Sequence, residues 1–164
     1  MKKIGLLSDT HGMILPSVLN FFKECDEVWH AGDIGSVAVS NTLETKHLFK
    51  AVYGNIDGYD IRSKYPEHIV IEIDGLKALM IHIGGYPGKY TKQAKELIET
   101  EKPGLFISGH SHILKVMPDK KHGLLHINPG SAGKQGLHQK ITCIRFIINK
   151  GKITELEVFE KERY

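Results

Sequence analysis

Residue types that bind divalent cations gather in five short clusters of this sequence. The clusters are Asp9-Thr10-His11, Gly32-Asp33, Gly54-Asn55-Ile56-Asp57, His82 and Gly109-His110-Ser111-His112. They combine carboxylate and amide oxygens with imidazole nitrogens, and such a mixed set suits Mn, Fe, Ni or Zn better than Mg or Ca. The chain has ten histidines, but their grouping with Asp and Asn, rather than their number, indicates a metal site.

The spacing within two of the clusters indicates how cations could share ligands. Residues two apart in an extended chain point to the same side. Asp9 and His11 can therefore bind one cation together, and so can His110 and His112, or each pair can straddle two sites. The carboxylate of Asp33 can bridge two cations through its two oxygens.

Each cluster taken singly also has an ordinary structural explanation. The segment Asp9-Thr10-His11-Gly12 can be a helix cap or a turn, Gly54-Asn55 is a common turn pair, and His82 in an apolar strand can be a core histidine. Their joint occurrence, in chain order and each at the end of a predicted strand, favours metal ligands. Glycines that permit a close approach of the backbone precede three of the ligands: Gly32, Gly54 and Gly109.

The elements that must position the first clusters form a βαβαβ unit. Apolar runs predict strands at 4–7, 28–31 and 49–53, and helical spacing predicts helices at 16–23 and 39–48. This alternation favours a parallel sheet with right-handed crossovers. Ligands in such sheets bind in the crevice beyond the carboxyl ends of the strands, so the clusters can face one crevice.

The second half of the chain is mainly β with one helix. A hairpin is expected from 69–73 and 77–83, turning at Asp74-Gly75, and a helix at 90–101 ends before Pro103-Gly104. Further strands are expected at 105–108, 114–117, 124–127, 141–148 and 153–159, the last two joined by a second hairpin turn at 149–151. Two sheets packed face to face with helices outside account for this pattern.

Composition narrows the class of protein. At 164 residues the chain has the length of a single domain, 1–164. A net charge of +3 with scattered lysines gives no specific signal for nucleic acid or an anionic membrane. Cys25 and Cys143 form no CxxC pattern, the apolar run before Asp9 is too short for a signal peptide, and no stretch could span a bilayer. A cytoplasmic protein is expected.

Taken in chain order, the five polar clusters resemble the motif pattern of the calcineurin-like metallophosphoesterase superfamily. The short chain and the segment Asn128-Pro129-Gly130-Ser131 are similar to its small phosphodiesterase branch of the YfcE type. The resemblance runs from residue 1 to about residue 150. It implies an α/β fold, a four-layer α/β/β/α sandwich of two mixed sheets flanked by helices.

The resemblance also implies a binuclear metal centre with Asp33 as the bridge. One cation would be held by Asp9, His11, Asp33 and His112, and the other by Asp33, Asn55, His82 and His110. The pair would be divalent transition metals, Mn first, with Ni, Fe or Zn as alternatives. A hydroxide bridging them would attack phosphorus, so no protein nucleophile is needed.

Other residues near the clusters could orient the ligands. Asp57, with Ser131 behind it, is the candidate for this role, and a plain turn residue is the alternative for both. His30, beside Gly32, is either a further supporting residue or a buried core histidine.

The sequence departs from the family pattern at two positions. Ile56 stands where many members have a His that protonates the leaving group, so the general acid is unassigned. Gly84 stands where many have a second His near the one that matches His82, and a metal ligand is lost there.

The expected function is hydrolysis of a small phosphoester, most simply a phosphodiester. The alternative is a non-catalytic protein-interaction scaffold of the same fold, as the retromer scaffold subunit exemplifies. A complete ligand set favours the enzyme, and the absence of a strong basic face disfavours a nuclease. The sequence leaves open whether the chain forms a homo-oligomer.

Overall fold

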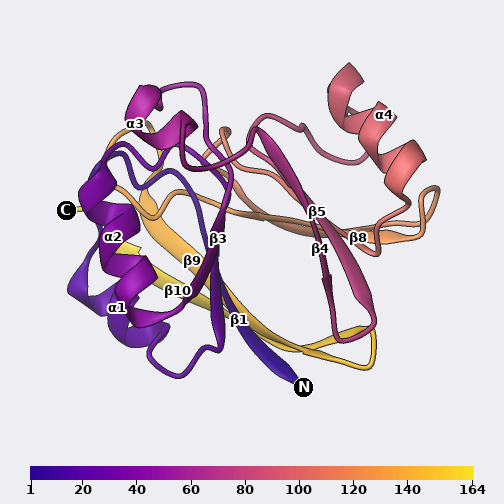
Figure 1. Cartoon of the computed structure of the whole chain (residues 1–164), viewed down its shortest axis with the longest axis horizontal. Helices are drawn as coiled ribbons and strands as arrows, with labels where there is room; N and C mark the ends of the chain where they lie inside the picture. Colours follow the sequence, from indigo (N-terminus) through magenta and orange to yellow (C-terminus); the bar gives the residue numbers. More distant parts are fainter.

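Two five-stranded sheets pack face to face in the computed structural model, which describes residues 1–164 (Figure 1). The first sheet has the order β10 (Lys152–Glu162), β9 (Lys140–Asn149), β1 (Lys2–Leu7), β2 (Glu27–His30) and β3 (Leu48–Ala51). The second has the order β4 (His68–Ile73), β5 (Leu76–Ile81), β6 (Leu105–Ile107), β8 (Leu124–Pro129) and β7 (Leu114–Asp119). Both sheets are mixed, because each contains parallel and antiparallel pairs.

Helices cover the outer surfaces of the two sheets. In Figure 1, α1 (Pro16–Phe21), α2 (Val37–Lys46) and the one-turn α3 (Tyr59–Arg62) lie on the side of the first sheet, and α4 (Lys92–Glu101) lies on the side of the second. The four-layer arrangement expected from the sequence is therefore confirmed. None of the helices is long and apolar enough to cross a membrane.

Hydrophobic side chains hold the layers together on both faces of β1. Ile4 and Leu6 belong to a cluster of 15 buried residues between the sheets, in which the Trp29 and Phe146 rings meet edge to face. Leu7 points the other way, into the cluster beneath α1 and α2. A strand buried on both faces reads as a continuous apolar run, which is why β1 was recognisable in the sequence.

The βαβαβ unit and both hairpins are also confirmed, with shifted element ends. β1, β2 and β3 are parallel neighbours. α2 ends at Lys46 rather than 48, because His47 is extended and Leu48 already pairs with Glu27. α4 begins at Lys92 rather than 90, because the Thr91 side chain caps it. The one-turn α3 was not expected, since four residues carry no helical periodicity.

The tight contact between β1 and α1 gives a test of the packing. A methyl group on Gly5 would lie 2.6 Å from Cδ1 of the buried Phe22 ring. We expect Gly5→Ala to lower the free energy of unfolding by about 1–3 kcal/mol, because the ring must shift in a filled core. Urea denaturation measures this.

Gly58→Ala is the matched control for that substitution. An added Cβ at Gly58 meets no atom within 4 Å, and its φ of −90° suits alanine. Its unfolding free energy should change by less than about 1 kcal/mol. Equal effects of the two substitutions would contradict the packing of Phe22 on β1.

Candidate metal centre

The five polar clusters lie together where strands of both sheets end. Asp9, Asp33 and Asn55 follow the parallel strands β1, β2 and β3, while His82 and His110 follow the parallel pair β5 and β6. Backbone hydrogen bonds tie the loops to one another: the Asp9 N–H donates to the Gly32 carbonyl and the Gly109 N–H donates to the His82 carbonyl. One crevice thus collects all seven predicted ligand residues.

Three of these residues form a first group of candidate ligands. Ligand atoms of Asp9, His11 and His112 all lie within 4.8 Å of one another. The His112 Nε2 atom is 3.2 Å from Asp9 Oδ1, and the His11 Nε2 atom is 3.8 Å from the same oxygen. The group offers one carboxylate oxygen and two imidazole nitrogens.

A second group lies beside the first. Ligand atoms of Asp33, His82 and His110 again lie within 4.8 Å of one another. The His82 Nε2 atom is 3.2 Å from Asp33 Oδ2. Asn55 joins this group through its Oδ1 atom, which is 3.0 Å from His110 Nδ1. The two atoms are within hydrogen-bonding distance, which places Asn55 beside the second group.

The Asp33 carboxylate lies between the two groups. Its Oδ2 atom is 3.7 Å from His11 Nε2 and 3.2 Å from His82 Nε2. The other oxygen, Oδ1, accepts a hydrogen bond from the Ile56 N–H at 3.1 Å. The same oxygen, Oδ2, therefore approaches both groups. The sequence had instead predicted one oxygen of Asp33 for each cation.

Buried polar atoms without partners test whether these residues fit a metal. Asp9 Oδ1, His11 Nε2 and His82 Nε2 are buried and make no hydrogen bond. Burying such atoms unpaired is costly, and a cation between them would satisfy all three. The Nδ1 atom of His82 lies 2.8 Å from the Ala31 carbonyl; donation there keeps the proton on Nδ1 and leaves the Nε2 lone pair for a metal. The residues fit a divalent transition metal.

The pKa values show how strongly the charges in this crevice interact. Burial would raise the pKa of Asp9, but the neighbouring His11 and His112 imidazoles hold it well below its usual range. Burial would also raise the pKa of Asp33, but His82 and the hydrogen bond from the Ile56 N–H outweigh this effect. The pKa of Asp33 is therefore lowered as well. The partner carboxylates raise the pKa of both His11 and His82. Carboxylate and imidazole side chains in the crevice therefore favour each other's charged forms.

The backbone at the ligands corrects one step of the sequence argument. It is not extended there: φ is positive at Asp9, His11, Asp33, His110 and His112. Asp9 and His11 do reach one group together, but His110 and His112 divide between the two groups. Left-handed backbone at residues other than glycine costs of order 1–3 kcal/mol each, and in this chain it is concentrated at the candidate ligands.

Asp57 fixes the loops rather than touching a candidate ligand side chain. Its buried carboxylate accepts hydrogen bonds from the backbone N–H groups of Ile34, Gly35 and Gly54 at 2.8–3.1 Å. It thereby joins the loop that carries Asp33 to the turn that carries Asn55. Ser131 has a similar place on the other side, because its Oγ donates to the Asp9 carbonyl at 3.0 Å.

Two supporting residues were missed or left open by the sequence. The Ser8 hydroxyl donates to Asp9 Oδ2 at 2.6 Å, and its place directly before Asp9 is the only signal that could have found it. His30 is fully buried. It accepts the Gly32 N–H at Nδ1, so its Nε2–H donates to the Thr10 hydroxyl at 2.9 Å. Burial lowers the pKa of His30 to about 3, so this link stays neutral.

Two glycines are required by close approach. A Cβ on Gly54 would lie 2.1 Å from Asp33 Oδ1, so only glycine leaves room for that carboxylate. A Cβ on Gly84 would lie 2.5 Å from the Phe106 ring. The space for the family's histidine at position 84 is thus taken by Phe106, which explains why the departure from the pattern is accommodated in the fold.

Comparisons with known proteins indicate the family to which the chain belongs. The family model described as "calcineurin-like phosphoesterase superfamily domain" matches residues 1–151. A protein of Methanothermobacter thermautotrophicus described as a "Probable metallophosphoesterase" is 32% identical over 136 residues, which are 78% of this chain and 76% of that protein.

Solved structures share the fold. A Streptococcus pneumoniae protein described as a predicted phosphoesterase is 23% identical, with a TM-score of 0.72 over 99% of this chain and 90% of that one. Vps29 from Entamoeba histolytica, solved in complex with zinc, is 17% identical, with a TM-score of 0.75 over 99% of both chains.

The contacts of Asp57 lead to a test of the loop arrangement. Asp57→Asn replaces one acceptor oxygen by an amide that faces backbone N–H groups. We expect a loss of about 1.5–3 kcal/mol in unfolding free energy, because hydrogen bonds to a charged acceptor are lost. Metal affinity should fall about 10–100-fold, as for groups that orient ligands.

Denaturation and metal titration measure the two effects of Asp57→Asn. Asp60→Asn, at a nearby exposed position in α3, is the control and should change neither. If Asp57→Asn kept both the stability and the metal affinity of the parent, Asp57 would have no supporting role.

Proposed function

The chain belongs to the calcineurin-like phosphoesterase superfamily, and on that premise we propose that it is a phosphodiesterase with a binuclear metal centre. The observation that carries this proposal is the pair of adjacent ligand groups on either side of Asp33 Oδ2. Three buried atoms at their centre that make no hydrogen bond support it.

Each cation would be held by a different subset of the crevice. Asp9, His11, Asp33 and His112 would hold the first, and Asp33, Asn55, His82 and His110 the second. Divalent cations bound there would supply Lewis acidity for the phosphoryl oxygens and lower the pKa of water. Nitrogen and oxygen donors suit Mn, Ni, Fe and Zn and do not by themselves choose among these metals; Mn is our first candidate.

The two cysteines and the two serines that contact Asp9 are unsuited to act as the nucleophile. Both cysteines are buried in the hydrophobic cluster beneath α1 and α2, and burial raises the pKa of the Cys25 thiol to about 11. The Ser8 and Ser131 hydroxyls are engaged with the Asp9 carboxylate and backbone. These facts favour water as the attacking group.

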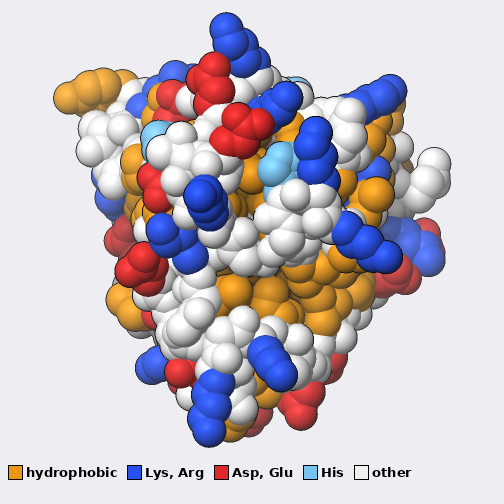
Figure 2. Space-filling view, turned by 90° about the vertical axis from the view of Figure 1, so that its right-hand side faces the viewer, with side chains coloured by type: hydrophobic (Ala, Val, Ile, Leu, Met, Phe, Trp, Pro, Cys, Tyr) orange, Lys and Arg blue, Asp and Glu red, His pale blue; other side chains and the backbone are white.

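The small-molecule substrate is favoured over nucleic acid by the distribution of charge. On the face in Figure 2, lysine and arginine side chains are interspersed with acidic ones and with hydrophobic areas, rather than forming one basic stripe. A phosphate backbone is usually met by clustered Lys and Arg. The chain's net charge of +3 is correspondingly mild.

A protein-interaction scaffold is the second candidate, because the fold matches Vps29 structures closely. Metal binding does not separate the two functions, since a Vps29 of this fold was solved with zinc. Turnover does. A metal-loaded sample that hydrolyses no activated diester would favour the scaffold.

Two metal-binding events are expected on titration of metal-free protein, because each group offers one Asp and two His but only the second has Asn55 beside it. Asp33→Asn should lower metal-dependent activity at least about 100-fold, since its oxygen serves both groups. The loss should exceed that of Asn55→Ala, which removes a neutral ligand of one group. Calorimetry and elemental analysis follow metal content.

A single saturable event would contradict the binuclear centre. Retention of most activity by Asp33→Asn would show that Asp33 is not the shared ligand.

Diesters should be hydrolysed faster than monoesters of the same aryl alcohol. A dianionic monoester depends more on a proton donor for its leaving group, and such a donor contributes about 10²–10⁴-fold. Ile56 cannot donate a proton, and its side chain is half exposed. We expect kcat/KM for bis(p-nitrophenyl) phosphate to exceed that for p-nitrophenyl phosphate by at least about tenfold. The metal-free protein is the control, and a faster monoester reaction would refute the preference.

A further inference from the structure

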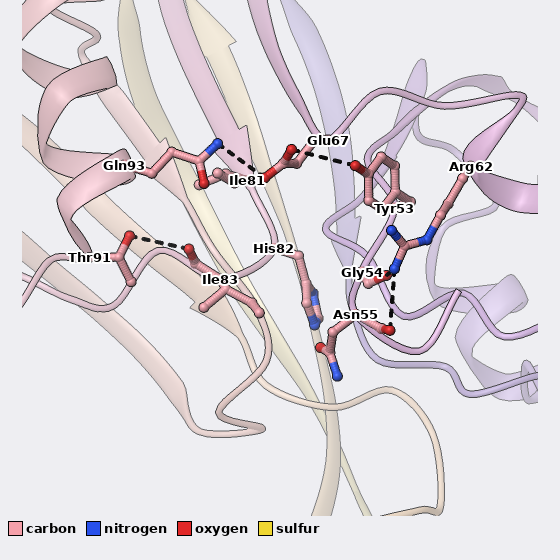
Figure 3. A pocket seen from close by; sticks show the side chains of 10 residues that line it. All are labelled: Tyr53, Gly54, Asn55, Arg62, Glu67, Ile81, His82, Ile83, Thr91 and Gln93. Atoms are coloured by element: carbon pink, nitrogen blue, oxygen red, sulfur yellow. Dashed lines mark hydrogen bonds between the residues drawn. The ribbon is translucent and has the colours of Figure 1, made fainter. Parts of the chain in front are cut away.

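A cavity of about 410 Å³ opens directly beside the second ligand group. Asn55 and His82, two candidate ligands of that group, form part of its wall. Figure 3 shows them on one side, with Glu67 and Gln93 across from them and Arg62 stacked beside Tyr53. A phosphoryl group held at the ligands would therefore direct one of its ester substituents into this space.

The far wall of the cavity carries an oriented acceptor. The Glu67 carboxylate receives the Gln93 amide N–H at Oε1 (3.0 Å) and the Tyr53 hydroxyl at Oε2 (3.4 Å). These bonds hold the carboxylate in place and use two of its roughly four lone-pair directions. The remaining directions, and the Gln93 amide oxygen, are left to accept hydrogen bonds from an occupant.

A donor stands on the opposite side of the same cavity. Arg62 donates from Nε to the Asp57 carbonyl at 2.6 Å and from Nη2 to the carbonyls of Gly54 and Asn55. Its guanidinium group lies 4.5 Å from the centre of the Tyr53 ring. The Nη1 atom takes part in none of these bonds, so it remains available to an acceptor on an occupant.

This lining favours a neutral polar substituent. Glu67 would repel and Arg62 would attract a second phosphate or a carboxylate, and the reverse holds for an ammonium group, so the lining as a whole favours neither charge. An aliphatic chain would desolvate Glu67, Gln93 and Arg62 without replacing their hydrogen bonds. Hydroxyl groups both donate and accept, and so match the carboxylate and the guanidinium together.

We propose that this cavity binds the alcohol portion of the phosphoester, and that this alcohol is a neutral polyol or sugar held between Glu67 and Arg62. The inference rests on the proposed function and extends it to a substrate class. The volume lies within the usual range for small-molecule sites, and Ile81 and Ile83 offer carbon surface to the backbone of such an alcohol.

Binding of two matched monoesters tests the proposal without requiring turnover. Glycerol phosphate and propyl phosphate share the phosphate and the carbon chain but differ in two hydroxyls. On the Mn-loaded full chain, calorimetry should give at least about tenfold tighter binding of glycerol phosphate, the scale of hydrogen bonds to a charged group. Equal affinities would overturn the proposal.

Variants connect the preference to the cavity. Glu67→Ala should bring the two affinities within about twofold of each other by weakening only glycerol phosphate, and Glu67→Gln should give an intermediate ratio. Glu99→Ala, an exposed change on α4 outside the cavity, should keep the parental ratio. An undiminished preference in Glu67→Ala would overturn the assignment of the cavity. Arg62 is unsuitable for this test because it also holds the loop of Asn55.

Turnover separates this inference from the function on which it rests. The p-nitrophenyl diesters of glycerol phosphate and propyl phosphate should show the same preference in kcat/KM. If neither diester is hydrolysed but glycerol phosphate binds preferentially, the proposed function fails and the polyol subsite stands. If both are hydrolysed at equal rates and the monoesters bind equally, the function stands and the subsite fails.

Discussion

The buried carboxylate of Asp9 is the group on which the arrangement of the crevice depends. One oxygen is satisfied by the Ser8 hydroxyl and the His110 N–H, while the other faces His11 and His112 without a hydrogen bond. A buried charge needs compensation nearby. Asp9 extends from the first sheet and His110 from the second, so this requirement brings the carboxyl ends of both sheets to one place. The layered packing around the hydrophobic cluster between the sheets makes that meeting geometrically available.

The loops at this meeting point are strained, and neighbouring polar groups hold them in place. Five candidate ligand residues have positive φ. The neutral His30, through Thr10 and Gly32, and the Asp57 carboxylate, through three N–H groups, join adjacent loops by buried hydrogen bonds. Such bonds are strong where water is excluded. The geometry of the candidate ligands is therefore held largely by hydrogen bonds within the chain itself.

The walls around the crevice differ in chemistry, which relates the fold to substrate choice. Phe106 occupies the space beside Gly84, so the loop after β5 contributes only the His82 imidazole to the second ligand group. On the opposite side, the β3–α3 segment carries Arg62 and Tyr53, and a polar cavity opens between them and Glu67. A crevice of this kind can position a phosphoryl group at the ligands and an organic group beside them. It offers no acid at position 56, so the nature of the leaving group has to contribute to the rate.

The sequence by itself determined the strands, both hairpins, the two-sheet architecture and the meeting of the five polar clusters. These follow from local apolar runs and from the rule that parallel strands end at one edge. Spacing alone left open whether His110 and His112 share one group, and the family resemblance implied that they divide. In the structure they lie in different groups, because a left-handed backbone at both residues redirects side chains that an extended chain would align. Tertiary structure also decided that α2 stops at Lys46, that His30 is neutral, and that Glu67 meets Gln93. Each of these depends on contacts between segments distant in sequence, which local periodicity does not encode.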